Sequence, residues 1–243
     1  MFLIIKCTMS VAGIIAARGG SKGLPNKHLR ILNGKPLLSW TIKQVFDSSL
    51  IDTFYLTTDC EKIIQIAIDE GVSSHQIIKR PKSLAEDNTL IIDVIDHTLD
   101  YILTKEKSPD YLALLEPTSP LRKPSDIDNA VEKLLINKHF DSLITLGEFR
   151  DHPFLAKQLD GDKYKSFIKT ENILSNRQTY DHLYFPYGVI YICKTNSLIK
   201  ERSFYTKNST FYLIDDWQCF EVDDIIDFHC IEAMMKLKPN FFD

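Results

Sequence analysis

A glycine- and lysine-rich segment, residues 17–27 with the sequence ARGGSKGLPNK, concentrates residue types that handle phosphate. Its glycines let backbone N–H groups turn toward phosphate oxygens, and Arg18, Lys22 and Lys27 add positive charge. The segment matches neither the GxxxxGK[ST] pattern of a Walker A loop nor GxGxxG. A solvated basic loop held by glycine turns is the alternative interpretation. The residue types favour phosphate binding.

Two carboxylates near the end of the chain, Glu221 and Asp223, are separated by a single residue. In an extended segment they point to the same side, and carboxylates together with substrate phosphates are the usual ligands of Mg²⁺. Alternatively, Asp223 or Asp224 caps the helix that follows, where a carboxylate opposes the helix dipole. The two roles are compatible. We expect Mg²⁺ at Glu221 and Asp223, with Mn²⁺ as an alternative ion.

A third segment, residues 80–87 (RPKSLAED), places Arg80 beside the rigid Pro81. The guanidinium could reach a base or a phosphate. Taken alone, this segment is better explained as an ordinary loop before a helix, with Asp87 or Asn88 as the N-cap.

A fourth segment, residues 114–122 (LLEPTSPLR), ends an apolar strand with two prolines. Such a stiff platform is suited to holding Glu116, Thr118 and Ser119 beside a ligand. A rigid strand-to-helix connection explains the prolines equally well.

The last candidate group is residues 176–178 (NRQ), together with residues 187–191 (YGVIY). Arg177 could form a bidentate pair with a substrate carboxylate, and a surface salt bridge is the alternative. The seven histidines lack metal-ligand spacing, and neither they nor the cysteines suggest a Ser-His-Asp or Cys-His set. The combination therefore favours metal-assisted nucleotidyl transfer over hydrolysis.

The elements that must position these residues alternate between strand-like and helical patterns, which is typical of a doubly wound α/β fold with a mostly parallel sheet. Ligands of such sheets bind at the carboxyl ends of the strands. We predict strands at residues 11–16, 54–57, 77–78, 111–115, 142–146, 189–193, 210–213 and 219–222. We predict helices at residues 37–45, 61–70, 90–105, 126–137 and 224–237.

Periodicity fails between residues 150 and 186, where polar, charged and aromatic residues mix. The abundance of Phe and Tyr indicates an insertion on the core rather than a linker. We expect one nucleotidyltransferase domain over residues 9–243 with this inserted segment.

Composition limits the class of protein. With 243 residues and 44% hydrophobic content, the chain can bury one sizeable core. A formal net charge of -4 argues against nucleic-acid binding. The four-residue apolar run at residues 2–5 is too short for a signal peptide, and no segment predicts a membrane span. Five cysteines without a CxxC pair fit a reducing cytoplasm. Either Met1 or Met9 could be the start.

In their order and spacing, these segments resemble the acylneuraminate cytidylyltransferase family, the CMP-sialic acid and CMP-legionaminic acid synthetases. ARGGSK followed by PNK is similar to the family's nucleotide-binding signature. RPKSLAED, LLEPTSPLR, NRQ followed by YGVIYI, and EVD are similar to four further family elements. The resemblance covers residues 11–236, and five elements in order are far more specific than any one.

The resemblance implies a Rossmann-like nucleotidyltransferase that transfers CMP from CTP to the anomeric hydroxyl of an acidic nine-carbon sugar and releases pyrophosphate. It implies a homodimer in which the inserted segment closes the partner's site. The implied nucleotide-binding residues are Arg18, Gly19, Ser21, Lys22, Lys27, Arg80 and Asp87. The implied sugar-binding residues are Glu116, Thr118, Ser119, Arg177, Gln178, Tyr187 and Tyr191. Arg18, Lys27 and Asp223 form the implied catalytic set.

Three residues depart from the family pattern. Glu116 replaces Gln, Tyr187 replaces Asn, and His28 replaces an Asn. The first two lie where the family reads its sugar, so legionaminic-type sugars are as well supported as N-acetylneuraminate. The alternatives are a cytidylyltransferase for an eight-carbon sugar of the Kdo type and an inactive nucleotide-sugar-binding relative.

Overall fold

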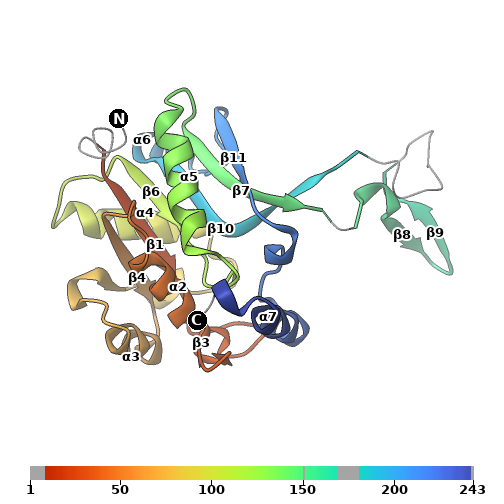
Figure 1. Cartoon of the computed structure of the whole chain (residues 1–243), viewed down its shortest axis with the longest axis horizontal. Helices are drawn as coiled ribbons and strands as arrows, with labels where there is room; N and C mark the ends of the chain where they lie inside the picture. The colour runs from red at the N-terminus through yellow and green to blue at the C-terminus, as the bar shows by residue number, and fades with distance from the viewer. Residues whose placement is uncertain (1–8, 150, 169–180, 242–243) are drawn as a thin grey trace.

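The computed structural model describes residues 9–149, 151–168 and 181–241. Its centre is a seven-stranded sheet in the order β11-β7-β10-β6-β1-β4-β5 (Figure 1). The strands are β1 (Val11–Ala16), β4 (Thr53–Thr58), β5 (Ile77–Lys79), β6 (Tyr111–Leu114), β7 (Ser142–Glu148), β10 (Tyr184–Lys194) and β11 (Ser209–Leu213). β10 runs antiparallel to both of its neighbours, and every other pairing in this sheet is parallel. The prediction of a mostly parallel α/β sheet is confirmed.

Helices cover both faces of the sheet. One face carries α2 (Leu37–Phe46), α3 (Glu61–Asp69) and α5 (Pro124–Ile136), and the other carries α4 (Ile91–Leu103) and α6 (Thr195–Glu201). β1 lies between the two layers, and its side chains alternate between them: Val11 and Ile15 pack on the first, Ala12 and Ile14 on the second. This double burial explains why the strand reads as a nearly continuous apolar run.

A smaller third cluster anchors the end of the chain. α7 (Ile225–Leu237) packs through Phe228, Ile231 and Met235 on Leu24 and Trp40, and Val222 is buried in the same cluster. The packing holds the segment before α7 against the loop that follows β1.

An arm leaves the body between β7 and β10 (Figure 1). It contains a short helical turn, Pro153–Leu155, and a two-stranded hairpin of β8 (Lys157–Asp160) and β9 (Lys163–Ser166). β10 begins at Tyr184, so this strand extends from the central sheet into the arm. The inserted segment predicted from the loss of periodicity corresponds to this region.

The remaining short elements lie in connections: β2 (Ile31–Leu32) and β3 (Lys35–Pro36) pair with each other, and single helical turns cover Lys27–Leu29, Ser74–Gln76, Lys82–Leu84, Asp216–Gln218 and Pro239–Phe241. Among the described residues, no helix combines the length and the hydrophobicity that a bilayer crossing needs.

One predicted strand is wrong. Residues 219–222 follow the turn Asp216–Gln218 and form no strand. Their backbone bonds a loop instead, because the N–H of Val222 donates to the carbonyl oxygen of Thr118 at 2.8 Å. The apolar residues that suggested a strand pack under α7 or on the core.

Candidate active site

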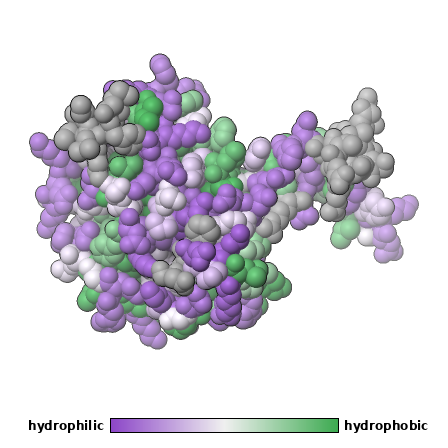
Figure 2. All heavy atoms as spheres, viewed as in Figure 1, coloured by the Kyte–Doolittle hydropathy of each residue, from purple (hydrophilic) through white to green (hydrophobic). Residues whose placement is uncertain are grey.

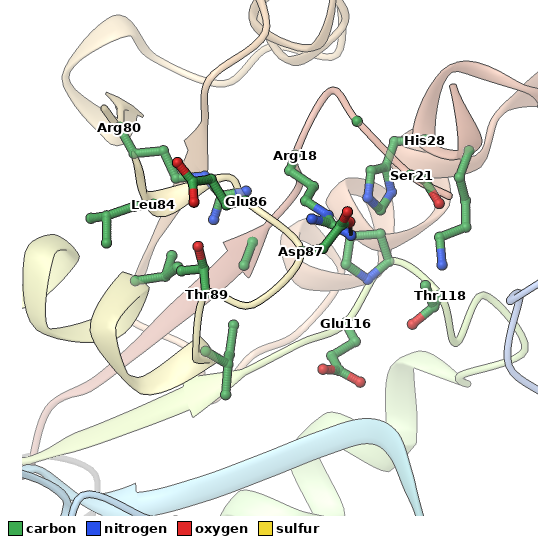
Figure 3. Close-up of a pocket in the computed structure, with 16 residues that line it drawn as sticks. Arg18, Ser21, His28, Arg80, Leu84, Glu86, Asp87, Thr89, Glu116 and Thr118 are labelled. Carbon is green, nitrogen blue, oxygen red and sulfur yellow. Dashed lines mark ion pairs between the residues drawn. The ribbon is translucent and has the colours of Figure 1, made fainter. Parts of the chain in front are cut away.

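The loops that follow β1, β5 and β6 enclose a pocket of about 270 Å³ at the carboxyl-end edge of the sheet (Figure 3). This is the edge where open parallel sheets bind ligands. Seven of the residues singled out in the sequence line it: Arg18, Ser21, Lys27, Arg80, Asp87, Glu116 and Thr118. Tertiary structure thus brings three distant segments to one place.

Asp87 bridges two cations of the loop after β1. Its carboxylate oxygens lie 2.8 Å from Arg18 Nη2 and 2.7 Å from Lys22 Nζ. Hydrogen bonds from Lys22 and Arg18 hold the pKa of Asp87 below its usual range. Arg18 Nη1 also donates to the carbonyl oxygen of Ala85 at 3.3 Å. Asp87 is not the helix cap considered above, since Leu90 occupies the N-cap of α4. It joins the two loops across the pocket.

The loop after β1 is fixed by close backbone contacts. The N–H of Gly19 donates to Asp59 Oδ1 at 2.9 Å. Gly23 lies against the segment before α7, where a Cβ would collide with the carbonyl oxygen of Asp223. Asn26 adopts a left-handed conformation with φ 54°, which this residue type tolerates well. These constraints set the direction in which Lys27 leaves the backbone.

Lys27 links the basic loop to the carboxylate segment. Its Nζ donates to the carbonyl oxygen of Val222 at 2.7 Å and lies 3.5 Å from Asp223 Oδ1. The lysine side chain is 12% exposed and that of Asp223 is 82% exposed. Lys27 is therefore held in place, whereas Asp223 presents a carboxylate to solvent. Asp224, the residue directly after Asp223, caps α7 by accepting from the N–H groups of Ile226 and Asp227.

Glu116 and Glu221 converge on Gly188. A Cβ at Gly188 would collide with Glu116 Oε2 and lie 2.8 Å from Glu221 Oε1. Glu221 Oε1 also accepts from the N–H of Gly188 at 2.6 Å and from Ser119 Oγ at 3.1 Å. Burial and the neighbouring Glu221 raise the pKa of Glu116 to about 7, and burial likewise raises the pKa of Glu221. The two carboxylates form an acidic end of the site that favours a proton or a positively charged or N–H-bearing partner.

Two of the predicted sugar-binding residues, Tyr187 and Tyr191, lie on β10. Tyr191 lies between Phe204 and Tyr205, with ring centroids 5.9 and 6.2 Å away, and burial together with Glu116 raises the pKa of its hydroxyl. The ring of Tyr187 lies against Gly147 on β7 and packs on the core. Neither tyrosine lines the pocket of Figure 3. Their sugar contacts stay predictions.

Arg122 received no role from the sequence, yet it organises the acidic end. It is fully buried, and burial lowers its pKa to about 10. Its Nη2 donates to the carbonyl oxygens of Glu116 and Gly188 at 3.0 and 3.1 Å, and its Nε donates to that of Val189. The guanidinium thereby ties the end of β6 to β10. The available signal was an arginine that ends the proline-containing segment 114–122 directly after Pro120 and Leu121.

Arg80 and His28 are the other buried polar residues of the pocket, at 5% and 7% exposure. Burial lowers the pKa of Arg80, and its Nε has no hydrogen-bond partner among the described residues. His28 was set aside in the sequence with the other histidines. Its position directly after Lys27, where it replaces a family Asn, was the signal that could have identified it.

Two predicted sugar-binding residues, Arg177 and Gln178, lie outside the described residues. In the part of the chain that the structure describes, no three His, Cys, Asp or Glu side chains are grouped to hold a metal ion. Asp223 alone offers an exposed carboxylate beside the lysine. A cation there needs further ligands, as Mg²⁺ commonly obtains from substrate phosphates.

Sequence comparison finds relatives along most of the chain. It is 34% identical over 230 residues to the post-translational flagellin modification protein B of Campylobacter coli, covering 92% of this chain and 94% of the relative. It is 30% identical to the CMP-N,N'-diacetyllegionaminic acid synthase of Legionella pneumophila, covering 96% and 99%. It is also 30% identical to an N-acylneuraminate cytidylyltransferase of Streptococcus agalactiae, covering 88% of this chain but only 51% of that longer relative.

Solved structures share the fold at low identity. A CMP:2-keto-3-deoxy-manno-octonic acid synthetase complexed with CTP superposes with a TM-score of 0.68 at 14% identity, covering 94% of this chain and 99% of that one. A cytidylyltransferase from Leptospira borgpetersenii gives a TM-score of 0.58 at 18% identity, covering 96% of each chain. A family model described as cytidylyltransferase matches residues 12–238. The chain belongs to the cytidylyltransferase family.

Proposed function

We propose that this enzyme transfers CMP from CTP to the anomeric hydroxyl of a nonulosonic acid of the sialic or legionaminic type and releases pyrophosphate. The observation that carries the proposal is the single pocket in which Arg18, Lys27 and Arg80 face the carboxyl end of β6, where Glu116 begins an acidic end. Relatives along nearly the whole chain, among them a CMP-N,N'-diacetyllegionaminic acid synthase, support the substrate class.

The cationic residues account for the chemistry at phosphorus. A bond forms between the anomeric oxygen and the α-phosphorus, and the bond from that phosphorus to the bridging oxygen breaks. The proton of the anomeric hydroxyl passes to solvent water. Negative charge grows on the departing pyrophosphate. Arg18, Lys22 and Lys27 stabilise it, and a fixed cation needs no reorganisation at that moment. Lys27 is suited to this because Val222 and the packing around it hold its side chain.

Asp223, with Glu221 beside it, would hold Mg²⁺ or Mn²⁺. An exposed carboxylate plus phosphate oxygens fits the way Mg²⁺ binds, through one or two carboxylates and the substrate. When bound, the ion supplies charge neutralisation on the phosphates. Glu221 Oε1 is already committed to Gly188 and Ser119, so Asp223 is the principal protein ligand.

The acidic end would receive the sugar. We assign the sugar to Glu116, Thr118 and Ser119, which follow β6, and to Tyr187 and Tyr191 on β10. The family resemblance adds Arg177 and Gln178, and the guanidinium of Arg177 is suited to the sugar carboxylate. A carboxyl group with a raised pKa lowers the repulsion toward an anionic sugar. It also offers a hydrogen-bonding site for amino or amide substituents.

The functional unit is a homodimer in this proposal. Figure 2 shows the arm standing clear of the rounded body. Leu159, Tyr164 and Phe167 on the arm are 81%, 71% and 69% exposed. Apolar residues on a slender projection are the kind that a second copy covers. Light scattering tests this assignment by measuring molecular mass. A dimeric wild type and a monomeric Phe167→Asp variant would support it, and a monomeric wild type would refute it.

We place the reaction in the cytoplasm. Among the described residues, Cys60, Cys193 and Cys230 are thiols outside any disulfide, and thiols persist where the surroundings are reducing. No nucleic-acid or membrane partner is part of the proposal.

The decisive experiment measures pyrophosphate release from CTP, with Mg²⁺ and a panel of sugars. We expect turnover with nonulosonic acids and none with ATP or GTP. Turnover with Kdo instead would assign the eight-carbon alternative. Binding of CTP without turnover of any sugar would assign the inactive relative.

A further inference from the structure

His28 is a buried side chain of the nucleotide pocket that the proposed reaction leaves without a role. It lies in the helical turn Lys27–Leu29, directly after the held lysine, and is 7% exposed. Its imidazole lines the same pocket as Arg18 and Arg80, and it lies on the Arg18 side of that pocket (Figure 3).

The imidazole is unsatisfied. Its Nδ1 is enclosed and has no hydrogen-bond partner among the described residues. A buried polar group without a partner lowers stability, and native structures contain few of them. Such a group facing a pocket is explained when a bound molecule supplies the missing partner.

The imidazole is also uncharged. Burial, reinforced by Lys27, Arg80 and Arg18, lowers the pKa of His28 to about 3. The acidic groups that line the same pocket, Glu86, Asp87 and Glu116, do not reverse this. At physiological pH the ring therefore offers one N–H donor and one acceptor nitrogen.

These properties separate His28 from the cations around it. Phosphate oxygens only accept hydrogen bonds, and Arg18, Lys22 and Lys27 already supply charged donors for them. A neutral imidazole adds little there. Ribose hydroxyls and the cytosine edge carry both donors and acceptors, which match a ring that can act either way.

We propose that His28 is a nucleotide-positioning residue that hydrogen-bonds, through its neutral imidazole, to the nucleoside half of the bound nucleotide. This inference rests on the proposed function, because it takes the pocket to be the CTP site. It also implies that the unpaired imidazole of His28 lowers the stability of the free protein and that nucleotide binding removes this cost.

The test replaces the ring by one of similar shape without nitrogen, His28→Phe. We expect the Kd of CTP and of CMP to rise at least tenfold (about 1.4 kcal/mol at 25 °C) by calorimetry, while the Kd of pyrophosphate alone stays within twofold. The thermal midpoint of the free variant should equal or exceed that of the wild type. His28→Asn, which restores a polar side chain, should recover part of the CTP affinity.

His97→Phe is the matched control. His97 Nδ1 is likewise enclosed without a partner, but this residue on α4 lies beside Ile77, Lys79 and Tyr101, away from the nucleotide pocket. This control should leave CTP binding unchanged. If His28→Phe weakens the binding of pyrophosphate as much as that of CMP, or leaves the binding of both unchanged, the inference is wrong. A wild type that binds no CTP would instead overturn the proposed function.

Discussion

The two ends of the site handle charge in opposite ways. At the cationic end, Arg18 and Lys22 both pair with the carboxylate of Asp87. These ion pairs are partly exposed, so an incoming anion can take the place of Asp87 beside either cation. At the acidic end, Glu116 and Glu221 face each other across Gly188. Burial raises the pKa of both carboxyl groups, and Glu221 adds to the shift of Glu116. Lys27 lies at the junction, bonded to the segment that carries Asp223. One end thus presents cations that suit the phosphate binding we propose, and the other favours a proton, a cation or a hydrogen-bond donor.

The largest effect on turnover is expected from Asp223→Asn, which removes the exposed carboxylate where the cationic and acidic ends meet. We expect the Mg²⁺-dependent turnover to be abolished. The thermal midpoint should stay close to that of the wild type, because the side chain is 82% exposed and Asp224 caps α7. Activity that survives with normal metal dependence would place the ion elsewhere.

Lys27→Ala tests the junction from the cationic side. Removing a fixed donor to developing charge typically lowers kcat by about 10²–10³-fold, and we expect a loss of this size. Lys62→Ala, on the exposed surface of α3, serves as the control and should turn over normally. Near-normal kcat for a folded Lys27→Ala protein would contradict the phosphate role.

Gly188→Ala tests the spacing of the acidic pair. The added methyl meets only the ends of two flexible side chains, so it should displace the carboxylates of Glu116 and Glu221 rather than disrupt β10. Misplacing groups in an active site can cost on the order of 10²-fold in rate, and we expect kcat to fall by up to this factor with a modest drop in thermal midpoint. If kcat is unchanged, the pair does not take part in turnover.

Glu116→Gln tests the charge of the acidic end through pH. The pKa of Glu116 is raised from 4.5 to about 7, so the folded protein keeps a proton that the unfolded chain has lost. Wild-type stability relative to the variant is therefore fully present below pH 4.5 and lost as pH rises through about 7. We expect a change of about 1–2 kcal/mol, less than the full shift implies because the site is partly open to solvent. Denaturant unfolding in EDTA between these pH values measures it, and a stability difference that does not change with pH would mean that folding leaves the pKa of Glu116 unshifted.

The smallest effect concerns the choice of sugar. If Glu116 accepts hydrogen bonds from an amide or amino substituent, kcat/KM should be higher for a legionaminic-type sugar than for N-acetylneuraminate. Glu116→Gln should narrow that gap by less than about tenfold, the scale of one hydrogen bond. Equal efficiencies that the substitution leaves unchanged would mean that Glu116 does not meet the sugar, and only the reaction class would stand.

Most of the fold follows from local pattern. The strands predicted at residues 11–16 and 111–115 are near-continuous apolar runs because helices cover both faces of the sheet. The five predicted helices occur with ends shifted by a few residues. The strand predicted at residues 219–222 is wrong because a short apolar run does not distinguish a strand from a segment buried under a helix. The antiparallel direction of β10 could not be predicted either, because the sequence of a strand does not show which strands pair with it or in which direction.

By itself, the sequence identified the candidate residues for binding phosphate and metal, because glycines, lysines, arginines and carboxylates have fixed chemistry and follow predicted strands. Only the tertiary structure decided which of them share charge: that Asp87 bridges two cations instead of capping a helix, that Asp224 takes the cap and leaves Asp223 exposed, and that Glu116 meets Glu221 across a glycine. Protonation states and unpaired groups depend on burial and on neighbours more than a hundred residues away. Those quantities exist only once the chain has folded.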